Sequence, residues 1–136
     1  MTTYFEDLTK VFDAALISFG STNSIDVILE NLKVTPSDPH LIGSQIIAAT
    51  DQSDLAWYER RVGFYQIDIR YAANSGSATL NRMADLINGA FKTGQAFIKN
   101  DICATVESVD ISSLYVDGGW AIRSISVNWT ATTARI

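Results

Sequence analysis

The stretch GFYQIDIRYAANSGSATLNRMADLINGAF, residues 63–91, holds the pattern of a strand, a turn and a helix in succession. From Tyr65 to Tyr71, apolar residues alternate with polar ones, which is typical of a strand with one buried face. Polar turn residues then break the alternation. From Leu80 to Phe91, apolar residues recur at helical spacing. The stretch therefore predicts a helix packed on a sheet, with its apolar residues in the core and not in a cofactor site.

Another helix is predicted near the N-terminus, from Tyr4 to Phe19, where the apolar residues form one stripe. Gly20 and the polar residues after it are expected to end this helix. The later helix would be capped at its start by Ser75 or Ser77, through a hydrogen bond from a backbone N–H. Gly94 stands where a left-handed C-terminal cap would lie.

Three strands are expected between the two helices. The first covers Ile25 to Thr35. Its apolar residues occupy both odd and even positions, which predicts a strand whose two faces are both covered. The second and third, Leu41–Thr50 and Leu55–Tyr71, would form a long hairpin whose distal part projects beyond the core. A short helix or loop over Leu55–Arg61 is the alternative to this hairpin.

Three further strands are expected after the second helix, at Ala96–Lys99, Ile102–Ile111 and Trp120–Thr133. In the middle strand the apolar residues change face near Glu107 and Ser108, which predicts a bulge or a bend. An Asp-Gly-Gly turn signal precedes the last strand.

These elements predict a single α+β domain over residues 1–136. Its mixed sheet would be mostly antiparallel, with the two α-helices packed on one face and the long β-hairpin protruding. The other face of the sheet would carry polar side chains that either meet solvent or line an assembly. They are Gln66, Asp68, Arg70, Ser124, Ser126 and Asn128.

The chain has one histidine and one cysteine. His40 follows Pro39 with no cluster of carboxylates or cysteines nearby, so we expect a solvated turn residue and not a catalytic base. Cys103 lies in an apolar run and is expected to be a buried small hydrophobe. A single cysteine allows no internal disulfide.

Charged residues make up 18% of the chain, against about 25% in an average protein, and the formal net charge is −5. The low charge suggests that partners cover some of the surface. Binding to a phosphate backbone requires clustered basic residues, and Arg60-Arg61 is a pair and not a patch. The N-terminus does not resemble a signal peptide, and no apolar run approaches about 18 residues, so we expect no membrane segment and a cytoplasmic protein at synthesis.

Motifs for chemistry are not found in the sequence. There is no nucleophile elbow, phosphate-binding loop or calcium loop, and a single histidine and a single cysteine make a zinc site improbable. Fifteen acids leave a carboxylate pair open, but none of them stands in a motif. We therefore expect no catalytic residues, no metal and no cofactor.

Several stretches together resemble the tail terminator, or tail completion, proteins of long-tailed non-contractile bacteriophages. The resemblance runs from about Ile28 onward, and it depends on several stretches together and not on any single residue. They are Glu30-Asn31-Leu32-Lys33-Val34-Thr35-Pro36, Gly63 to Tyr71, Ala84-Asp85-Leu86-Ile87 through Phe91, and Gly119-Trp120 before the last strand.

The resemblance implies a structural virion protein at the head-proximal end of the tail. Such proteins cap the tail tube as a ring, commonly six-fold, end its polymerisation and present the surface that joins the head. The implied partners are other copies of the chain, the tail tube protein and a head completion or connector protein, while DNA passes through without specific binding. An acidic channel wall would repel the passing phosphates.

Ring contacts join one patch to a different patch on the neighbour, and the long hairpin is the natural arm for such a contact. Aromatic residues and arginine are typical anchors of interfaces, so the candidate contact residues are Trp57, Tyr58, Arg60 and Arg61. Two alternatives are a head–tail connector or other minor tail component, and a small bacterial ligand-binding domain or enzyme. The last would need a pocket with convergent polar groups.

Overall fold

The computed structural model describes residues 4–29, 39–52, 58–72, 77–99 and 102–134. Within these ranges the chain forms two helices and seven strands. They are α1 (Tyr4–Asn23), β1 (Asp26–Leu29), β2 (His40–Gln52), β3 (Tyr58–Ala72), α2 (Ser77–Ala90), β4 (Ala96–Lys99), β5 (Ile102–Ile111), β6 (Tyr115–Asp117) and β7 (Trp120–Ala134).

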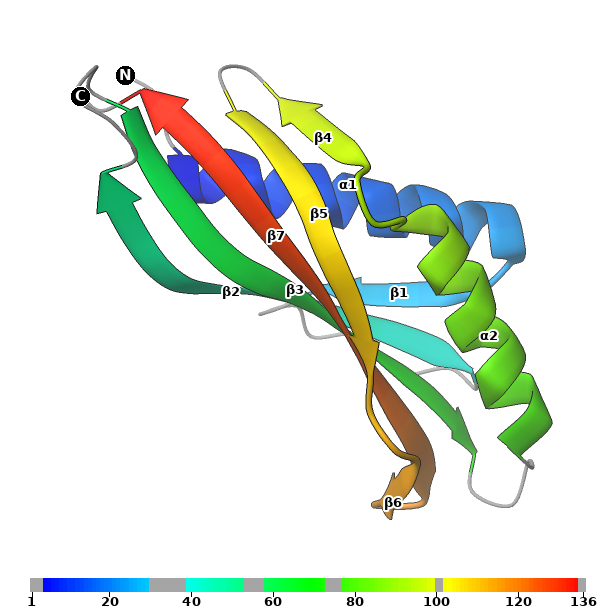
Figure 1. Ribbon diagram of the computed structural model, residues 1–136. Helices are drawn as coiled ribbons and strands as arrows, with labels where there is room; N and C mark the ends of the chain where they lie inside the picture. Colours follow the sequence, from blue (N-terminus) through cyan, green and yellow to red (C-terminus); the bar gives the residue numbers. More distant parts are fainter. Residues whose placement is uncertain (1–3, 30–38, 53–57, 73–76, 100–101, 135–136) are drawn as a thin grey trace.

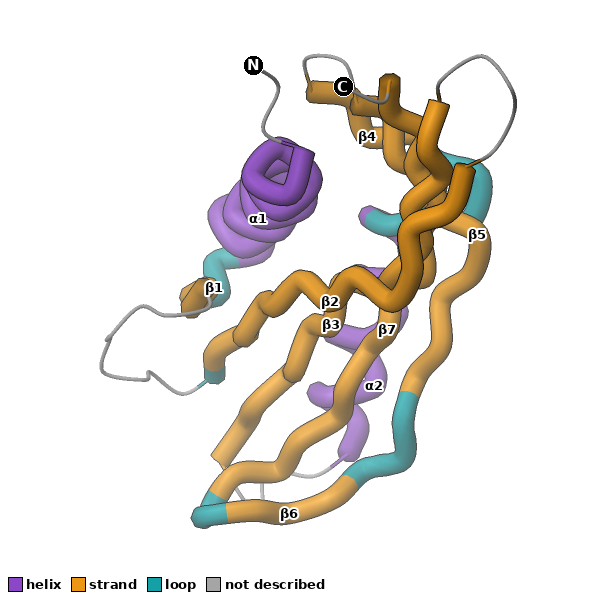
Figure 2. The backbone as a smooth tube through the Cα atoms, turned by 90° about the vertical axis from the view of Figure 1, so that its left-hand side faces the viewer, coloured by secondary structure: helices purple, strands orange, loops and turns teal. Residues whose placement is uncertain are grey.

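The strands form one curled sheet in the order β1-β2-β3-β7-β5-β4, and β6 pairs separately with β7 (Figure 1). Only β1 and β2 run parallel, so the sheet is mixed and mostly antiparallel. Figure 2 shows α1 and α2 on the same, concave side of this sheet. The predicted α+β architecture is confirmed.

The core lies between the two helices and the concave face of the sheet. Its centre is Phe12 of α1, whose ring lies 5.4 Å from that of Tyr65, 5.2 Å from that of Phe97 and 6.1 Å from that of Trp129. The alternation of apolar and polar residues from Tyr65 to Tyr71 explains this arrangement, because it places Tyr65 and every second residue after it on the same face of the sheet.

The first helix is longer than predicted, because it continues past Gly20 to Asn23. A Cβ on Gly20 would lie 2.5 Å from a methyl group of Val27 and 2.7 Å from the carbonyl oxygen of Ile25. Glycine is therefore used here for close packing of β1 on the helix, and the helix stops instead at Ser24, where φ is +56°. The N–H of Ile25 donates to the carbonyl of Gly20 at 2.9 Å and closes this end.

The second helix begins at Ser77, one of the two predicted capping positions, and ends at Ala90. Gly94 has the predicted positive φ of +87°, but it belongs to the turn before β4 and not to the helix end. Its N–H donates to the carbonyl of Val106 at 2.7 Å, which ties this turn to β5.

The bulge in β5 is confirmed, because the register with β7 shifts between Val106 and Ser108. Its effect is to keep the apolar residues on one face. Val106 is opposite Trp129, and Val109 beyond the bulge is opposite Val127, so both strand halves face the helices.

Two single-residue expectations were wrong. His40 is not a solvated turn residue, since it begins β2 with 1% of its surface exposed and packs edge-on to Trp120 at a ring distance of 4.8 Å. Cys103 is exposed, because the neighbouring Ala104 takes the core-facing position of β5. The burial of His40 depends on a residue that is far away in the sequence.

The predicted long hairpin is present as β2 and β3, which pair from His40 opposite Arg70 to Gln52 opposite Glu59. It is not a free two-stranded arm, because β7 pairs with β3 along its full length, from Ala72 opposite Trp120 to Tyr58 opposite Ala134. The distal end is therefore part of the main sheet, which β5 and β4 continue beyond β7, since Thr132 is opposite Cys103 and Cys103 is opposite Ile98. Of the expected first strand, Asp26–Leu29 is present as β1, and residues 30–38 lie outside the described part of the chain.

Candidate assembly interface

The distal end of the sheet carries three of the four candidate contact residues, Tyr58, Arg60 and Arg61 of β3. Arg60 is exposed and Arg61 is half-buried, and they alternate on β3, so they belong to opposite faces of the sheet. Arg61 is opposite the buried Ala131 and therefore lies on the helix side. Tyr58 begins β3, but its side chain lies outside the described residues, as does the whole of Trp57.

The face of the sheet that points away from the helices is polar and largely hydrogen-bonded within itself. The hydroxyl of Ser124 donates to a carboxylate oxygen of Asp68 at 2.6 Å, and the amide of Gln66 donates to the same oxygen at 3.1 Å. Farther along, the amide of Asn128 donates to the Asp110 carboxylate at 2.8 Å. The six polar residues predicted for this face are all half-buried, which is consistent with the predicted alternation.

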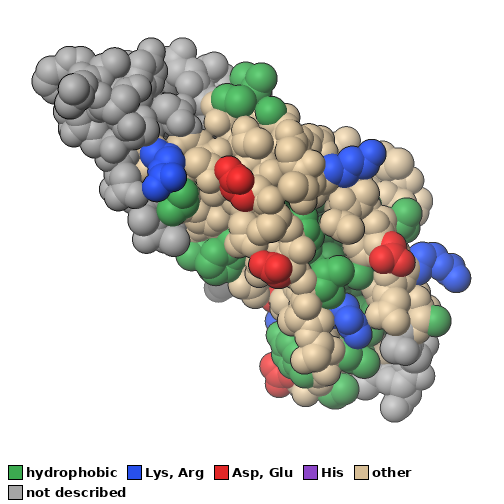
Figure 3. All heavy atoms as spheres, viewed as in Figure 1, with side chains coloured by type: hydrophobic (Ala, Val, Ile, Leu, Met, Phe, Trp, Pro, Cys, Tyr) green, Lys and Arg blue, Asp and Glu red, His purple; other side chains and the backbone are tan. Residues whose placement is uncertain are grey.

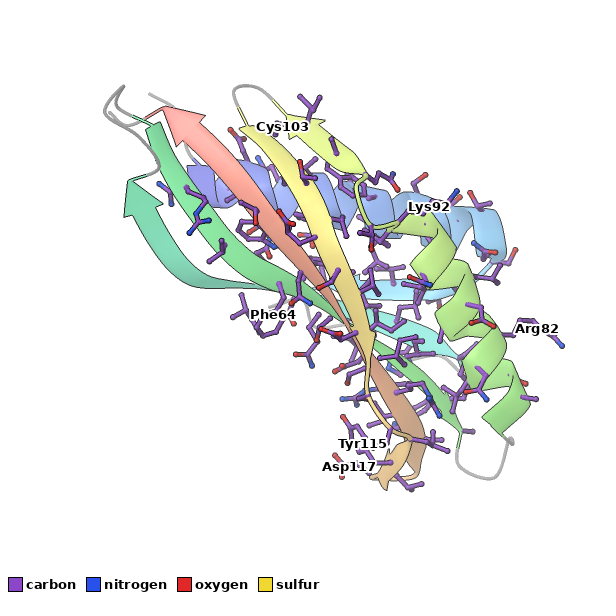
Figure 4. All side chains as sticks on the ribbon, viewed as in Figure 1. Phe64, Arg82, Lys92, Cys103, Tyr115 and Asp117 are labelled. Carbon is purple, nitrogen blue, oxygen red and sulfur yellow. The ribbon has the colours of Figure 1, made fainter. Side chains whose placement is uncertain are left out.

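The short strand β6 was not predicted, and it forms a hairpin with β7 through a two-residue turn. Gly118 and Gly119 both have positive φ, 57° and 83°, as a type I′ turn requires. β6 lies at the lower end of the molecule in Figure 4, where Tyr115 and Asp117 are labelled. The turn signal was visible in the sequence, but a three-residue strand is too short for its alternation to be recognised.

Exposed apolar side chains gather around β6, where Figure 3 shows green side chains over the lower end of the molecule. Val116 is 65% exposed and Tyr115 46% exposed. Ile111, at the end of β5, and Leu114 are also large hydrophobic residues that remain exposed. Acidic side chains lie along the same side of the sheet, over β5 and β6 (Figure 3).

Surface hollows lie beside α1 in the described part of the chain. One, of about 510 Å³, lies between the end of α1 and β1, and another, of about 420 Å³, lies between α1, α2 and β4. Among the described residues, Asp26 is the ionisable side chain that lines them. The other polar side chains of the linings are uncharged: Ser21 and Ser24 in the first hollow, and Ser18, Thr22, Asn23 and Gln95 in the second.

Within the described ranges, no three His, Cys, Asp or Glu side chains come together as a metal site would need. No helix in the described part of the chain is long and apolar enough to cross a membrane.

Comparison with protein families gives a match to the phage tail terminator protein family over residues 7–129, which is most of the chain. The chain belongs to the phage tail terminator family. The family resemblance expected from the sequence is thereby confirmed, and the family is one of structural virion proteins of the phage tail.

A solved protein structure shares the fold of this tail terminator with a TM-score of 0.67. The two sequences are 18% identical, and the similarity covers 90% of this chain and 94% of the other. At this identity the likeness concerns the fold alone. No curated protein matches the chain significantly.

Proposed function

We propose that this tail terminator caps the tail tube of a long-tailed, non-contractile phage as a ring, stops polymerisation of the tube protein, and forms the surface that joins the head. The observation that carries the proposal is the family match, which spans both helices and nearly all of the sheet.

The ring is proposed to be a closed homo-oligomer, six-fold by the resemblance, with one side on the tail tube protein and the other on a head completion or connector protein. The candidate contact residues at the distal end of the sheet remain Trp57, Tyr58, Arg60 and Arg61. A closed ring uses heterologous contacts, in which each copy offers two different patches.

DNA is proposed to pass through the ring without specific binding, and the acid excess of the chain suits that role. The net charge of −5 gives a wall that repels phosphates, because like charges raise the energy of the bound state. Neutralising acids that line the channel should slow DNA ejection, and unchanged ejection kinetics in such variants would contradict this part of the proposal.

The test is polymerisation of the tail tube protein of the same phage, with and without this chain. The proposal expects tubes of limited length with the chain at one end, seen by electron microscopy with a tag on the chain. Light scattering on the chain alone and with tubes gives the oligomeric state. If the tubes grow to their usual length and the chain does not bind them, the capping function is contradicted, and the chain would be a different component of the tail.

A further inference from the structure

Two edges of the sheet are open along part of their length within the described residues. β1 pairs with β2 from His40 to Gly43, so β2 has no described neighbour on its outer side from Ser44 to Gln52. On the opposite side of the sheet, β4 pairs with β5 from Ile102 to Thr105. We define residues Ser44–Gln52 as the β2 edge and residues Glu107–Asp117 as the β5–β6 edge.

The β5–β6 edge presents main-chain groups that can bind another strand. In a two-residue hairpin the residues beside the loop form a hydrogen-bonded pair, here Asp117 and Trp120. The next pair, Val116 and Ala121, is then of the non-hydrogen-bonded kind. The N–H and carbonyl of Val116 therefore point outward, to the side of β6 on which the described residues provide no strand.

This edge has a bulge and exposed carboxylates, but it lacks the lysine and proline that protect many open edges. Natural open edges carry lysine, proline or inward-pointing charges that prevent association. From residue 100 to residue 122 the chain contains no lysine, arginine or proline. Instead, Tyr115 and Val116 expose large apolar surfaces at the open edge.

The β2 edge matches the β5–β6 edge in exposed apolar surface, and the strand next to it, β3, carries two arginines. Ile46 is 39% exposed and lies opposite Phe64 on the polar face of the sheet, the same face on which the register places Tyr115. Arg60 and Arg61 are opposite Asp51 and Thr50 of the β2 edge. The β5–β6 edge is acidic, with three exposed carboxylates: Glu107, Asp110 and Asp117.

We propose that the copies in the ring are joined by strand pairing, in which the β5–β6 edge of one copy lies along the β2 edge of the next. This inference rests on the proposed ring. A second copy is the favoured occupant because the chain itself supplies both edges, and a closed ring would then leave neither of them open. Pairing an exposed edge with a strand of another chain is a common mode of recognition.

The position of the two edges makes the contact head-to-tail. They are on opposite sides of the sheet, and they also lie at different heights along β7. Val116 of the β5–β6 edge is opposite Ala121 of β7. Ile46 of the β2 edge is aligned, through Phe64, with Asn128 of β7. This offset of seven residues corresponds to about 23 Å at 3.3 Å per residue. Such a contact is heterologous, which generates a ring when the rotation between copies closes.

The first test separates main-chain pairing from side-chain contact at Val116. Val116→Pro removes the outward N–H and is tolerated by an edge strand, whereas Val116→Thr keeps the N–H and the β-branched shape. We expect ring assembly, measured by light scattering in the presence of tail tubes, to weaken about tenfold or more for V116P and much less for V116T. Circular dichroism and denaturation confirm that both variants fold. Equal assembly of both folded variants would overturn the proposal.

The second test locates the partner surface by cross-linking on assembled tubes in a Cys103→Ser background. Copies with Tyr115→Cys are mixed with differently tagged copies that carry a cysteine at Ser44, Ile46 or Thr50, and a short bifunctional maleimide is added. The proposal expects mixed-tag dimers and none within a single variant. Dimers between two Tyr115→Cys copies would indicate a two-fold contact, and cross-links to the tail tube protein would assign the edge to the tube. Either result overturns the inference.

The two proposals fail in different ways. If the chain caps tubes but none of the three pairs cross-links, the ring is built by other surfaces, and the terminator function stands without strand pairing. If mixed-tag dimers form but tubes grow to their usual length, the copies pair as inferred and the capping function is wrong.

Discussion

The indole N–H of Trp129 donates a hydrogen bond to the side-chain carbonyl oxygen of Gln45 at 2.9 Å, inside the core. The amide nitrogen of Gln45 in turn donates to the main-chain carbonyl of Leu8 at 3.2 Å. One buried glutamine thus joins β7, β2 and α1. This arrangement holds α1 against β2 and β7 at Gln45 and Trp129, next to the distal end of the sheet that carries the candidate contact residues.

Removing both members of this network should cost less than the sum of the two separate losses. Trp129→Phe leaves the Gln45 oxygen buried without its donor, and we expect a loss of about 1–3 kcal/mol in the free energy of unfolding beyond the lost packing. The double variant with Gln45→Met should lose less than the sum of the two single losses. Urea denaturation of the four proteins measures this coupling, and strictly additive losses would show that the hydrogen bond contributes nothing.

Glycine at position 43 is required by the packing of α1 on β2. A Cβ there would lie 2.3 Å from the hydroxyl oxygen of Tyr65 and 2.7 Å from a methyl group of Leu16. Both neighbours are fully buried, and the Tyr65 hydroxyl donates to the carboxylate of Asp13. Gly43→Ala should therefore destabilise the protein by about 1–3 kcal/mol in denaturation experiments.

The matched control for that substitution is Gly89→Ala on α2, where a Cβ would meet no atom within 4 Å. Because glycine lowers helix stability, this variant should gain about 0.5–1 kcal/mol. Adding Tyr65→Phe to Gly43→Ala removes the closest clash and should recover part of the loss. A neutral Gly43→Ala variant would show that the helix can move away from β2.

The end of α1 offers a stabilising substitution. Ser24 has a φ of +56° and an exposed side chain, and left-handed backbone is unfavourable for residues other than glycine. Ser24→Gly should raise the free energy of unfolding by about 0.5–1 kcal/mol. Ser21→Gly, an exposed position within the helix, should lower it by a similar amount. Thermal unfolding should show a higher melting temperature for Ser24→Gly and a lower one for Ser21→Gly than for the unaltered protein.

Periodic stretches of the sequence predicted most of the fold. The alternation in Tyr65–Tyr71 and the helical spacing in Leu80–Phe91 are local signals, and both elements are found with their apolar faces in the core. The strands Ala96–Lys99 and Ile102–Ile111 have the predicted bounds. These elements follow from residues that are near one another in the chain, which is why the sequence alone reveals them.

The errors arose where a distant residue decides the outcome. His40 is buried by Trp120, eighty residues later in the chain, and Gly20 is needed for contact with β1 and not for stopping the helix. The edges of the candidate interface, which are open among the described residues, depend on strand order, and no single stretch encodes that order. Strand order was therefore the missing information for the site, since it places the ends of β2 and β6 on opposite sides of the sheet.

The arginine pair at the distal end should act in assembly more than in folding. We expect Arg60→Glu, at an exposed site beside the β2 edge, to weaken ring formation on tail tubes because it adds acid opposite the acidic β5–β6 edge of the next copy. Its free energy of unfolding should change by less than about 1 kcal/mol, which is the usual range for an exposed charged side chain and its partner. Arg82→Glu makes the same charge change at an exposed position on α2 and should assemble normally (Figure 4).

Because screening by salt weakens exposed charge pairs, the difference in assembly between the Arg60→Glu and Arg82→Glu variants should shrink as ionic strength rises. Equal assembly of both variants at low salt would exclude Arg60 from the contact.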